Sequence, residues 1–223
     1  MSVINIAIDG PAGAGKSTIS RKVAAELGFI YIDTGSLYRT VALNAIMQQT
    51  DLSDTAAIEK SIENQPKIEL GFVDGEQRNY LNGVDVSDKI RTPEISTSAS
   101  KVSAVPVIRQ YLFDLQKTMA EQNSCVMDGR DIGTVVLPNA KVKIFLTASP
   151  ESRATRRYDE LISKGMDVTF EDVLNDMKKR DYDDMNREIS PLKAADDAKL
   201  LDTSGFELEK SVALVIKTVK ENI

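Results

Sequence analysis

The chain has 223 residues, a net charge of −6, 42% hydrophobic and 28% charged residues, and no histidine. This composition is typical of a soluble globular protein with a sizeable core, and the negative charge argues against a general nucleic-acid or acidic-membrane binder. Because histidine is absent, the usual general base and the commonest zinc ligand are missing. The chemistry must therefore use Mg²⁺, lysine, arginine and carboxylates.

The single cysteine and the lack of targeting segments suggest where the protein works. Cys125 lies in an apolar run, so we expect a small buried side chain and no intrachain disulfide. No apolar stretch is long enough to span a bilayer, and the chain opens directly into a strand and a glycine-rich loop rather than a signal peptide. We expect a cytoplasmic monomer that binds neither membrane nor nucleic acid.

The first predicted unit is a strand, a glycine-rich loop and a helix. Residues 3–8 are apolar and rich in β-branched side chains, which favours a buried parallel strand. Residues 10–17 match G-x-x-x-x-G-K-[ST], and residues 17–27 follow with a helical apolar face that Gly28 ends. Such a loop aims backbone N–H groups and a helix N-terminus at phosphate oxygens. A dinucleotide-binding G-x-G-x-x-G is excluded, because residue 18 is threonine.

A second strand–helix unit and an inserted lobe follow. Residues 29–32 predict a strand, residues 33–36 a polar loop, and the apolar pattern after Leu37 a helix. Ser53 is expected to cap a helix that reaches about Asn64. From residue 67 to about 88, short alternating runs separated by Asp-Gly and Asn-Gly pairs predict a small antiparallel meander. No chemical motif lies in this insert.

The rest of the chain returns to alternating helices and strands. Two helices, residues 94–105 and 107–121, are separated by Pro106. Strands are expected at 124–127, 141–146 and 199–201, and helices at about 150–164, 170–187 and 206–219, the first two capped by Ser149 and Thr169. The predicted fold class is therefore α/β: a three-layer P-loop NTPase fold with a central five-stranded parallel sheet and an inserted antiparallel β lobe.

Most arginines follow a strand or lie on the next helix, which predicts a phosphate-binding cluster within an acidic protein. They are Arg39, Arg109, Arg130, Arg153, Arg156, Arg157, Arg180 and Arg187. Exposed helix cations in weak salt bridges are the alternative for the three on residues 150–164. Clustered cations also predict an open ligand-free site whose arginines repel one another.

Three segments and two residue pairs together resemble bacterial cytidylate kinase: residues 10–18, 33–39 and 128–136, and the pairs at 180–181 and 186–187. The run at 128–136 is the most specific, and the likeness extends from about residue 3 to 220. The resemblance implies phosphoryl transfer from ATP to CMP or dCMP. It implies a CORE (about 1–33, 104–149 and 188–223), an NMP-binding lobe (about 34–103) and a LID (about 150–187).

The resemblance also assigns roles to individual residues. ATP would be bound by Gly10, Pro11, Ala12, Gly13, Ala14, Gly15, Lys16, Ser17 and Thr18. Tyr38, Arg39 and Arg130 would face the CMP phosphate with Thr34 nearby; Ser100, Arg109, Asp131 and Arg187 would contact cytosine, and Arg180 and Asp184 the ribose. Arg153 and Arg157 would approach the transferring phosphate, which makes Lys16, Arg130, Arg153 and Arg157 the catalytic set.

Mg²⁺ is expected to accompany ATP, because phosphoryl transfer depends on charge neutralisation. Ser17 would hold it together with Asp128, through water; some relatives carry glycine at the Ser17 position, which leaves Thr18 as an alternative. Asp128 could instead be a turn or capping residue. For Asp181 and Asp183 a solvated helix face is the preferred interpretation, and Asp131 could serve only to pair with Arg130 or Arg109.

Two other functions remain to be weighed. A kinase for adenylate, uridylate or shikimate would share the fold and differ in the acceptor pocket. A GTPase switch would need Asn-Lys-x-Asp, and no Asn-Lys pair occurs in the chain. Formation of ADP that requires a nucleoside monophosphate would separate the kinase from the switch.

Overall fold

The structure is a computed structural model that describes residues 3–223. It divides into two compact units, one made of the chain up to residue 30 together with 123–223, and the other of residues 31–122. The predicted CORE, NMP-binding lobe and LID stay a prediction. In the described part of the chain, no helix combines the length and apolar character that a membrane span requires.

The first unit carries most of a five-stranded sheet in the order β2-β6-β1-β7-β8. Its elements are β1 (Asn5–Asp9), α1 (Lys16–Leu27), β6 (Cys125–Gly129), β7 (Val142–Thr147), α6 (Pro150–Ser163), α7 (Phe170–Asn186), β8 (Lys199–Asp202) and α8 (Leu208–Lys220). Strand β1 pairs in parallel with β6 and β7, and β7 pairs in parallel with β8. This confirms the predicted α/β fold with a five-stranded parallel sheet.

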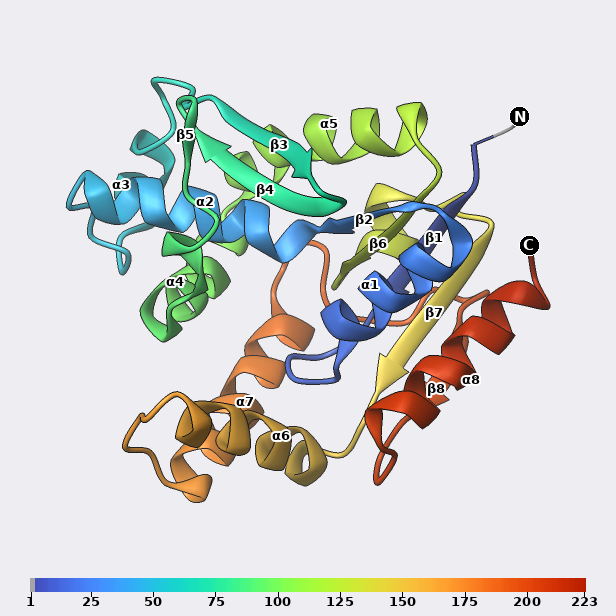
Figure 1. Ribbon diagram of the computed structural model, residues 1–223. Coiled ribbons are helices and arrows are strands. Elements are labelled where there is room, and N and C mark those ends of the chain that lie inside the picture. Colours follow the sequence, from blue (N-terminus) through green and yellow to red (C-terminus); the bar gives the residue numbers. More distant parts are fainter. Residues whose placement is uncertain (1–2) are drawn as a thin grey trace. The chain divides into compact units, whose positions relative to one another are not determined.

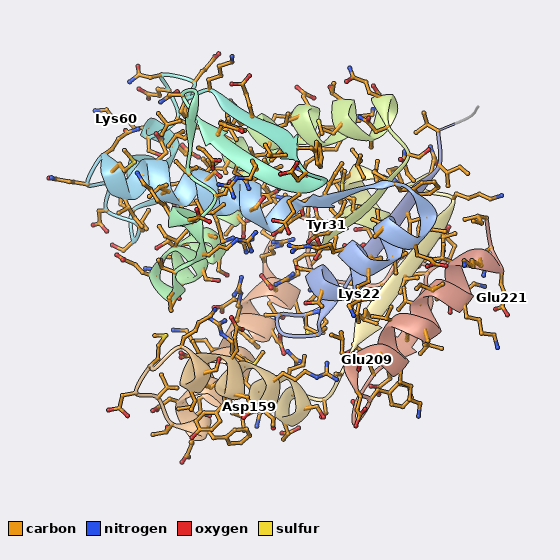
Figure 2. All side chains as sticks on the ribbon, viewed as in Figure 1. Lys22, Tyr31, Lys60, Asp159, Glu209 and Glu221 are labelled. Carbon is orange, nitrogen blue, oxygen red and sulfur yellow. The ribbon has the colours of Figure 1, made fainter. Side chains whose placement is uncertain are left out.

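The apolar residues of the strands at the centre of this sheet are buried. Ile6, Ile8 and Val126 are fully buried, as expected for parallel strands covered on both faces. Helices α1 and α8 lie side by side, as Figure 1 shows, and charged residues such as Lys22 and Glu209 project from them into solvent (Figure 2). Cys125 is buried as predicted; burial raises the pKa of its thiol to about 12, which leaves it unreactive.

Helices α6 and α7 pack against each other through their own small apolar cluster (Figure 1). Its buried members are Ala154, Leu161, Val173 and Met177. The predicted caps are confirmed: Ser149 accepts from the Ser152 N–H at 3.2 Å, and Thr169 accepts from the Asp172 N–H at 3.1 Å. The sequence did not predict the π-helical turn Ile132–Val136 that follows β6.

The second unit has its own core and its own sheet. Its elements are β2 (Ile30–Asp33, whose first residue ends the first unit), α2 (Thr34–Met47), α3 (Thr55–Lys60), β3 (Ile68–Val73), β4 (Glu76–Leu81), β5 (Val84–Asp85), a 3₁₀ turn (Lys89–Arg91), α4 (Pro93–Ser103) and α5 (Pro106–Gln122). Strands β3, β4 and β5 form the predicted antiparallel meander. Its core includes Leu37, Val41, Ile90 and Ile108.

The limits of two helices in this unit, α2 and α3, differ most from the sequence prediction. Residues 34–36 form the first turn of α2 rather than a loop, because the Asp33 carboxylate caps the helix by accepting the Ser36 N–H at 3.0 Å. Helix α3 is capped by Asp54 rather than Ser53, and ends at Lys60, before the expected Asn64. Ser53 instead hydrogen-bonds to Asp51, which takes its hydroxyl away from the helix.

Candidate active site

The glycine-rich loop forms the predicted turn between β1 and α1. Gly10 has a φ of 151°, and a Cβ there would lie 1.9 Å from the carbonyl oxygen of Leu146 on β7, so only glycine fits. Gly15 precedes α1 with a left-handed φ of 84° and offers no side-chain cap. The first N–H groups of α1 are therefore open to an anion at the helix N-terminus.

Lys16 is buried beside this loop, with 6% of its surface exposed, and its ammonium donates to the carbonyl oxygen of Pro11 at 2.8 Å. Burial lowers the pKa of Lys16, and the charge of Arg130 lowers it further, while Asp128, Asp184 and Asp9 act in the opposite direction. A buried cation without full compensation favours an incoming anion. The position suits a lysine that binds nucleotide phosphates.

Asp128 lies at the end of β6, opposite Ile8 in the parallel register with β1. Its Oδ2 accepts a 3.0 Å hydrogen bond from the Ser17 hydroxyl at the start of α1. A hydroxyl and a carboxylate in contact are hard oxygen donors, which fit Mg²⁺. Over residues 3–223, no three acidic, histidine or cysteine side chains gather into a metal cage. The Ser17–Asp128 pair supplies two oxygen donors, which suits an ion that keeps several waters and shares phosphate oxygens.

Arg130 follows β6 and pairs with a carboxylate from α7. Its Nε lies 2.8 Å from Asp184 Oδ2, and the two side chains are 20% and 7% exposed. Burial acts to raise the pKa of Asp184, but the nearby arginines, Arg130 first among them and then Arg180 and Arg187, lower it below its usual value. Asp184 is therefore ionised, and it fixes one edge of the Arg130 guanidinium.

The turn after Arg130 is held by Asp9, a residue that the sequence analysis did not select. The Asp9 carboxylate accepts the N–H of Ile132 at 2.8 Å and that of Gly133 at 2.7 Å. Burial raises the pKa of Asp9 to about 6, although these two hydrogen bonds act to lower it. Asp9 thereby ties the end of β1, just before the glycine-rich loop, to the loop that carries Asp131.

Asp131 is buried and lies 3.6 Å from Nη2 of Arg187, which begins the segment after α7. The alternative interpretation from the sequence, that Asp131 only pairs with Arg130 or Arg109, stays a prediction beside this ion pair. Arg180 lies in α7, close enough to Asp184 to lower its pKa. Four predicted acceptor-binding residues of this unit are thus brought together with Arg130: Asp131, Arg180, Asp184 and Arg187.

Arg153 on α6 forms a two-bond ion pair with Asp181 on α7. Its Nη1 and Nη2 contact the two carboxylate oxygens of Asp181 at 3.0 and 2.6 Å, and Nε and Nη1 also donate to the carbonyl oxygens of Ala148 and Ala12 at 2.9 Å. The interpretation of Asp181 as a solvated residue is therefore wrong, because it is the partner of a buried arginine. Asp183, two residues on, is exposed as predicted.

The other two arginines of α6 differ in their surroundings. Arg156 Nη2 donates to the carbonyl oxygen of Thr203 at 2.9 Å. Arg157 pairs with Glu160 at 2.8 Å on the same helix, with about a third of its side chain exposed. Arg157 is thus more accessible to a ligand than Arg153, whose side chain is 3% exposed.

Four predicted residues of the second unit lie at or beside the start of α2: Thr34, Tyr38, Arg39 and Arg109. Arg39 pairs with Asp33 at 2.7 Å, and the Arg109 guanidinium lies 5.5 Å from the centre of the Tyr38 ring. Arg109 also donates to the carbonyl oxygen of Ser103 at 3.1 Å. Thr34 is buried at the first position of α2, and Ser100 is half-buried in α4.

Comparison with known proteins decides the family. A model of the cytidylate kinase family matches residues 6–221. The chain is 48% identical, over the full length of both proteins, to a cytidylate kinase of Caldicellulosiruptor bescii. It is also 48% identical to a cytidylate kinase of Lactobacillus johnsonii, over 98% of this chain and 95% of the other. The chain belongs to the cytidylate kinase family.

A solved structure supports the fold alone. An uncharacterised protein of Eubacterium ventriosum aligns over 97% of this chain and 98% of its own with a TM-score of 0.55 and 14% identity. Two residues of this family member were not assigned to the site from the sequence: Asp9 was not selected, and Asp181 was interpreted as solvated. Asp9 could have been noticed as a carboxylate at the carboxyl end of a buried strand, where ligands of parallel sheets bind. Nothing in the local sequence marks Asp181.

Proposed function

We propose that this protein is a nucleoside monophosphate kinase that transfers the γ-phosphoryl group of ATP to CMP or dCMP. The observation that carries the proposal is the meeting, within one unit, of the glycine-rich loop and Lys16 with the ion-paired loop of Arg130 and Asp131. The first pair of features suits a triphosphate donor, and the second suits an anionic acceptor with a polar base edge. Membership of the cytidylate kinase family supplies the identity of that acceptor.

The reaction needs positioning and charge neutralisation more than acid–base chemistry. An oxygen of the acceptor phosphate forms a bond to the γ-phosphorus while the bond to the β-phosphate oxygen breaks and ADP leaves. The attacking oxygen is already largely anionic near neutral pH, so the absence of histidine is no obstacle. Lys16 and the backbone N–H groups of the glycine-rich loop would together bind the β- and γ-phosphates.

Mg²⁺ would supply further charge neutralisation when bound with ATP, held by the Ser17 hydroxyl or that of Thr18 and, through water, by Asp128. The Ser17–Asp128 contact of 3.0 Å favours Ser17. We assign Arg130, Tyr38, Arg39 and Thr34 to the acceptor phosphate.

The remaining assignments concern the nucleoside and the transferred group. We assign Asp131, Arg187, Ser100 and Arg109 to cytosine, because cytosine offers an amino donor beside a ring-nitrogen acceptor. Arg180 and Asp184 are assigned to the ribose, and Arg153 and Arg157 to the transferring phosphate. We further propose that the enzyme works as a monomer in the cytoplasm.

An acceptor screen tests the proposal. The protein is incubated with ATP and Mg²⁺ and with CMP, dCMP, UMP, AMP or shikimate in turn, and ADP formation is followed together with chromatography of the products. We expect ADP and the matching diphosphate with CMP and dCMP. The Lys16→Ala variant should lose at least about 10³-fold in kcat while remaining folded. ADP formation without an acceptor, or only with AMP or shikimate, would contradict the assignment.

A further inference from the structure

A buried polar network joins the β insert to the start of α2. Gln77 and Asn79 are two residues apart on β4, so their side chains share one face of the strand. The Gln77 amide donates from Nε2 to the Ser36 hydroxyl at 2.6 Å, and its Oε1 accepts the backbone N–H of Asp33 at 2.8 Å. The Ser36 oxygen also lies 2.7 Å from Asn79 Oδ1.

Asp33 connects this network to an arginine. Its carboxylate caps α2 through the Ser36 N–H and, with its other oxygen, accepts from Arg39 Nη2 at 2.7 Å. The backbone of Asp33 is thus fixed by Gln77, and its side chain fixes Arg39. Within residues 3–223, the buried Nε of Arg39 has no hydrogen-bond partner. The Arg39 side chain is 21% exposed, so the ion pair orients the guanidinium and leaves part of it accessible to a ligand.

Asn79 links strand β4 to the turn at Asp85 through hydrogen bonds. It is fully buried, and its N–H donates to the Ser87 hydroxyl at 2.8 Å, which in turn contacts Asp85 Oδ1 at 2.6 Å. Arg78 on the same strand pairs with Asp85 at 2.8 Å. The strand is consequently anchored on one side by the Asp85 turn and on the other by the α2 terminus.

We propose that Gln77 is a positioning residue for acceptor-phosphate binding, acting through Asp33 on Arg39. The inference rests on the proposed function, because that function assigns Arg39 to the CMP phosphate. A side chain held by hydrogen bonds before the ligand arrives loses less freedom on binding. The insert, which carries no chemical motif in its sequence, thereby takes part in substrate recognition.

The simpler explanation is that Gln77 only fastens the insert to α2, and the chain offers a matched control for it. Gln48 ends the same helix, and its Nε2 donates to the carbonyl oxygen of Ser61 at 3.0 Å. Gln48→Met and Gln77→Met both replace an amide by an apolar side chain of similar length. Of these two glutamines, Gln77 is the one that contacts Asp33, the ion-pair partner of Arg39.

The experiment measures CMP binding by calorimetry, and steady-state kinetics, for the parent, Gln77→Met, Gln48→Met, Arg39→Ala and the double variant Gln77→Met/Arg39→Ala. We expect Gln77→Met to weaken CMP binding and raise KM for CMP by about tenfold, with KM for ATP and kcat within about twofold. Gln48→Met should bind CMP like the parent even where its melting temperature falls. In the Arg39→Ala background, Gln77→Met should no longer weaken CMP binding.

Two results would overturn the positioning role: CMP binding by Gln77→Met within twofold of the parent, or an undiminished effect in the Arg39→Ala background. Should Gln77→Met fail to fold, Gln77→Asn serves the same comparison, because its shorter amide cannot reach both Asp33 and Ser36. A parent protein that forms no ADP with CMP contradicts the proposed function instead. The two failures are therefore distinguishable.

Discussion

The Arg153–Asp181 pair allows the structural and catalytic roles of one arginine to be separated. The Arg153 side chain is 3% exposed and that of Asp181 is 15% exposed. Removal of one partner from a buried ion pair costs about 3–5 kcal/mol, because the other charge is left uncompensated. Arg153 keeps its bonds to the carbonyl oxygens of Ala148 and Ala12, so we expect Asp181→Ala to lie near the lower limit, about 3 kcal/mol.

Removal of Arg153 instead of Asp181 should lower the free energy of unfolding by less. In Arg153→Met the carboxylate of Asp181 can recover part of its hydration, so we expect a loss of about 1–2 kcal/mol. The double variant Arg153→Met/Asp181→Leu removes both charges and should return to within about 1 kcal/mol of the parent. The free energy of unfolding is measured by urea denaturation at pH 7.5 without nucleotide. Asp183→Ala, an exposed change on the same helix, is the control and should lie within about 0.5 kcal/mol of the parent.

Activity of the stable double variant then decides the catalytic assignment. If Arg153 contacts the transferring phosphate, kcat should fall by about 10²-fold or more although the protein is folded. A double variant with parental kcat would show that Arg153 acts only through packing. If Asp181→Ala costs no more than Asp183→Ala, the reasoning from the buried pair is refuted.

Three further predictions concern pH, base preference and motion. Burial raises the pKa of Asp9 to about 6, so between about pH 4 and 6 the folded state holds a proton that the unfolded state has lost, and the stability contributed by Asp9 falls as pH rises. The free energy of unfolding of the parent minus that of Asp9→Asn should therefore drop by about 2–3 kcal/mol between pH 4 and 7. A difference that does not change with pH contradicts this. Asp131→Asn should lower kcat/KM for CMP and shrink the CMP-over-UMP ratio, since the amide adds a donor where the cytosine amino group needs an acceptor; an equal loss for both substrates would make Asp131 structural. Amide hydrogen exchange across residues 150–190 should slow when CMP and a non-hydrolysable ATP analogue are bound, and unchanged exchange would argue against a LID there.

The sequence predicted those parts of the fold that depend on local patterns. The β1 strand, the glycine-rich loop and α1 follow from residues within about twenty-five positions of one another, and so do the Ser149 and Thr169 caps. The start of α2 was missed for a local reason as well. Asp33 and Gly35 are typical of loops, but the Asp33 side chain is used as a helix cap.

The remaining site features depend on partners distant in the sequence. Asp181 looks like one more acidic residue of an exposed helix until Arg153, 28 positions earlier, is placed against it. Asp9 reaches Gly133 across 124 positions, and Gln77 reaches Asp33 across 44. Hydrophobic periodicity contains no information about such polar pairings, because either partner alone is compatible with a solvated position.

The pairing of the arginines changes the electrostatic argument for the whole site. The sequence predicted clustered cations that repel one another in the absence of ligand, and this is wrong for four of them. They pair with carboxylates: Arg39 with Asp33, Arg130 with Asp184, Arg153 with Asp181 and Arg187 with Asp131. A guanidinium has five N–H donors on more than one edge, so a carboxylate on one edge can orient another edge toward a phosphate.

Arg153 departs from this arrangement, because Nε and both terminal nitrogens are already engaged by Asp181 and by backbone carbonyl oxygens. A phosphate could bind Arg153 only in exchange for one of these partners, whereas Arg39 is bonded to Asp33 through Nη2 and its side chain is 21% exposed. Binding to Arg39 should therefore be possible in the conformation seen here, and binding to Arg153 should require α6 and α7 to rearrange. Under the proposed assignments, arginines that are already in place would bind the acceptor phosphate, and the transferring phosphate would be bound by one that becomes available only when the segment carrying it moves.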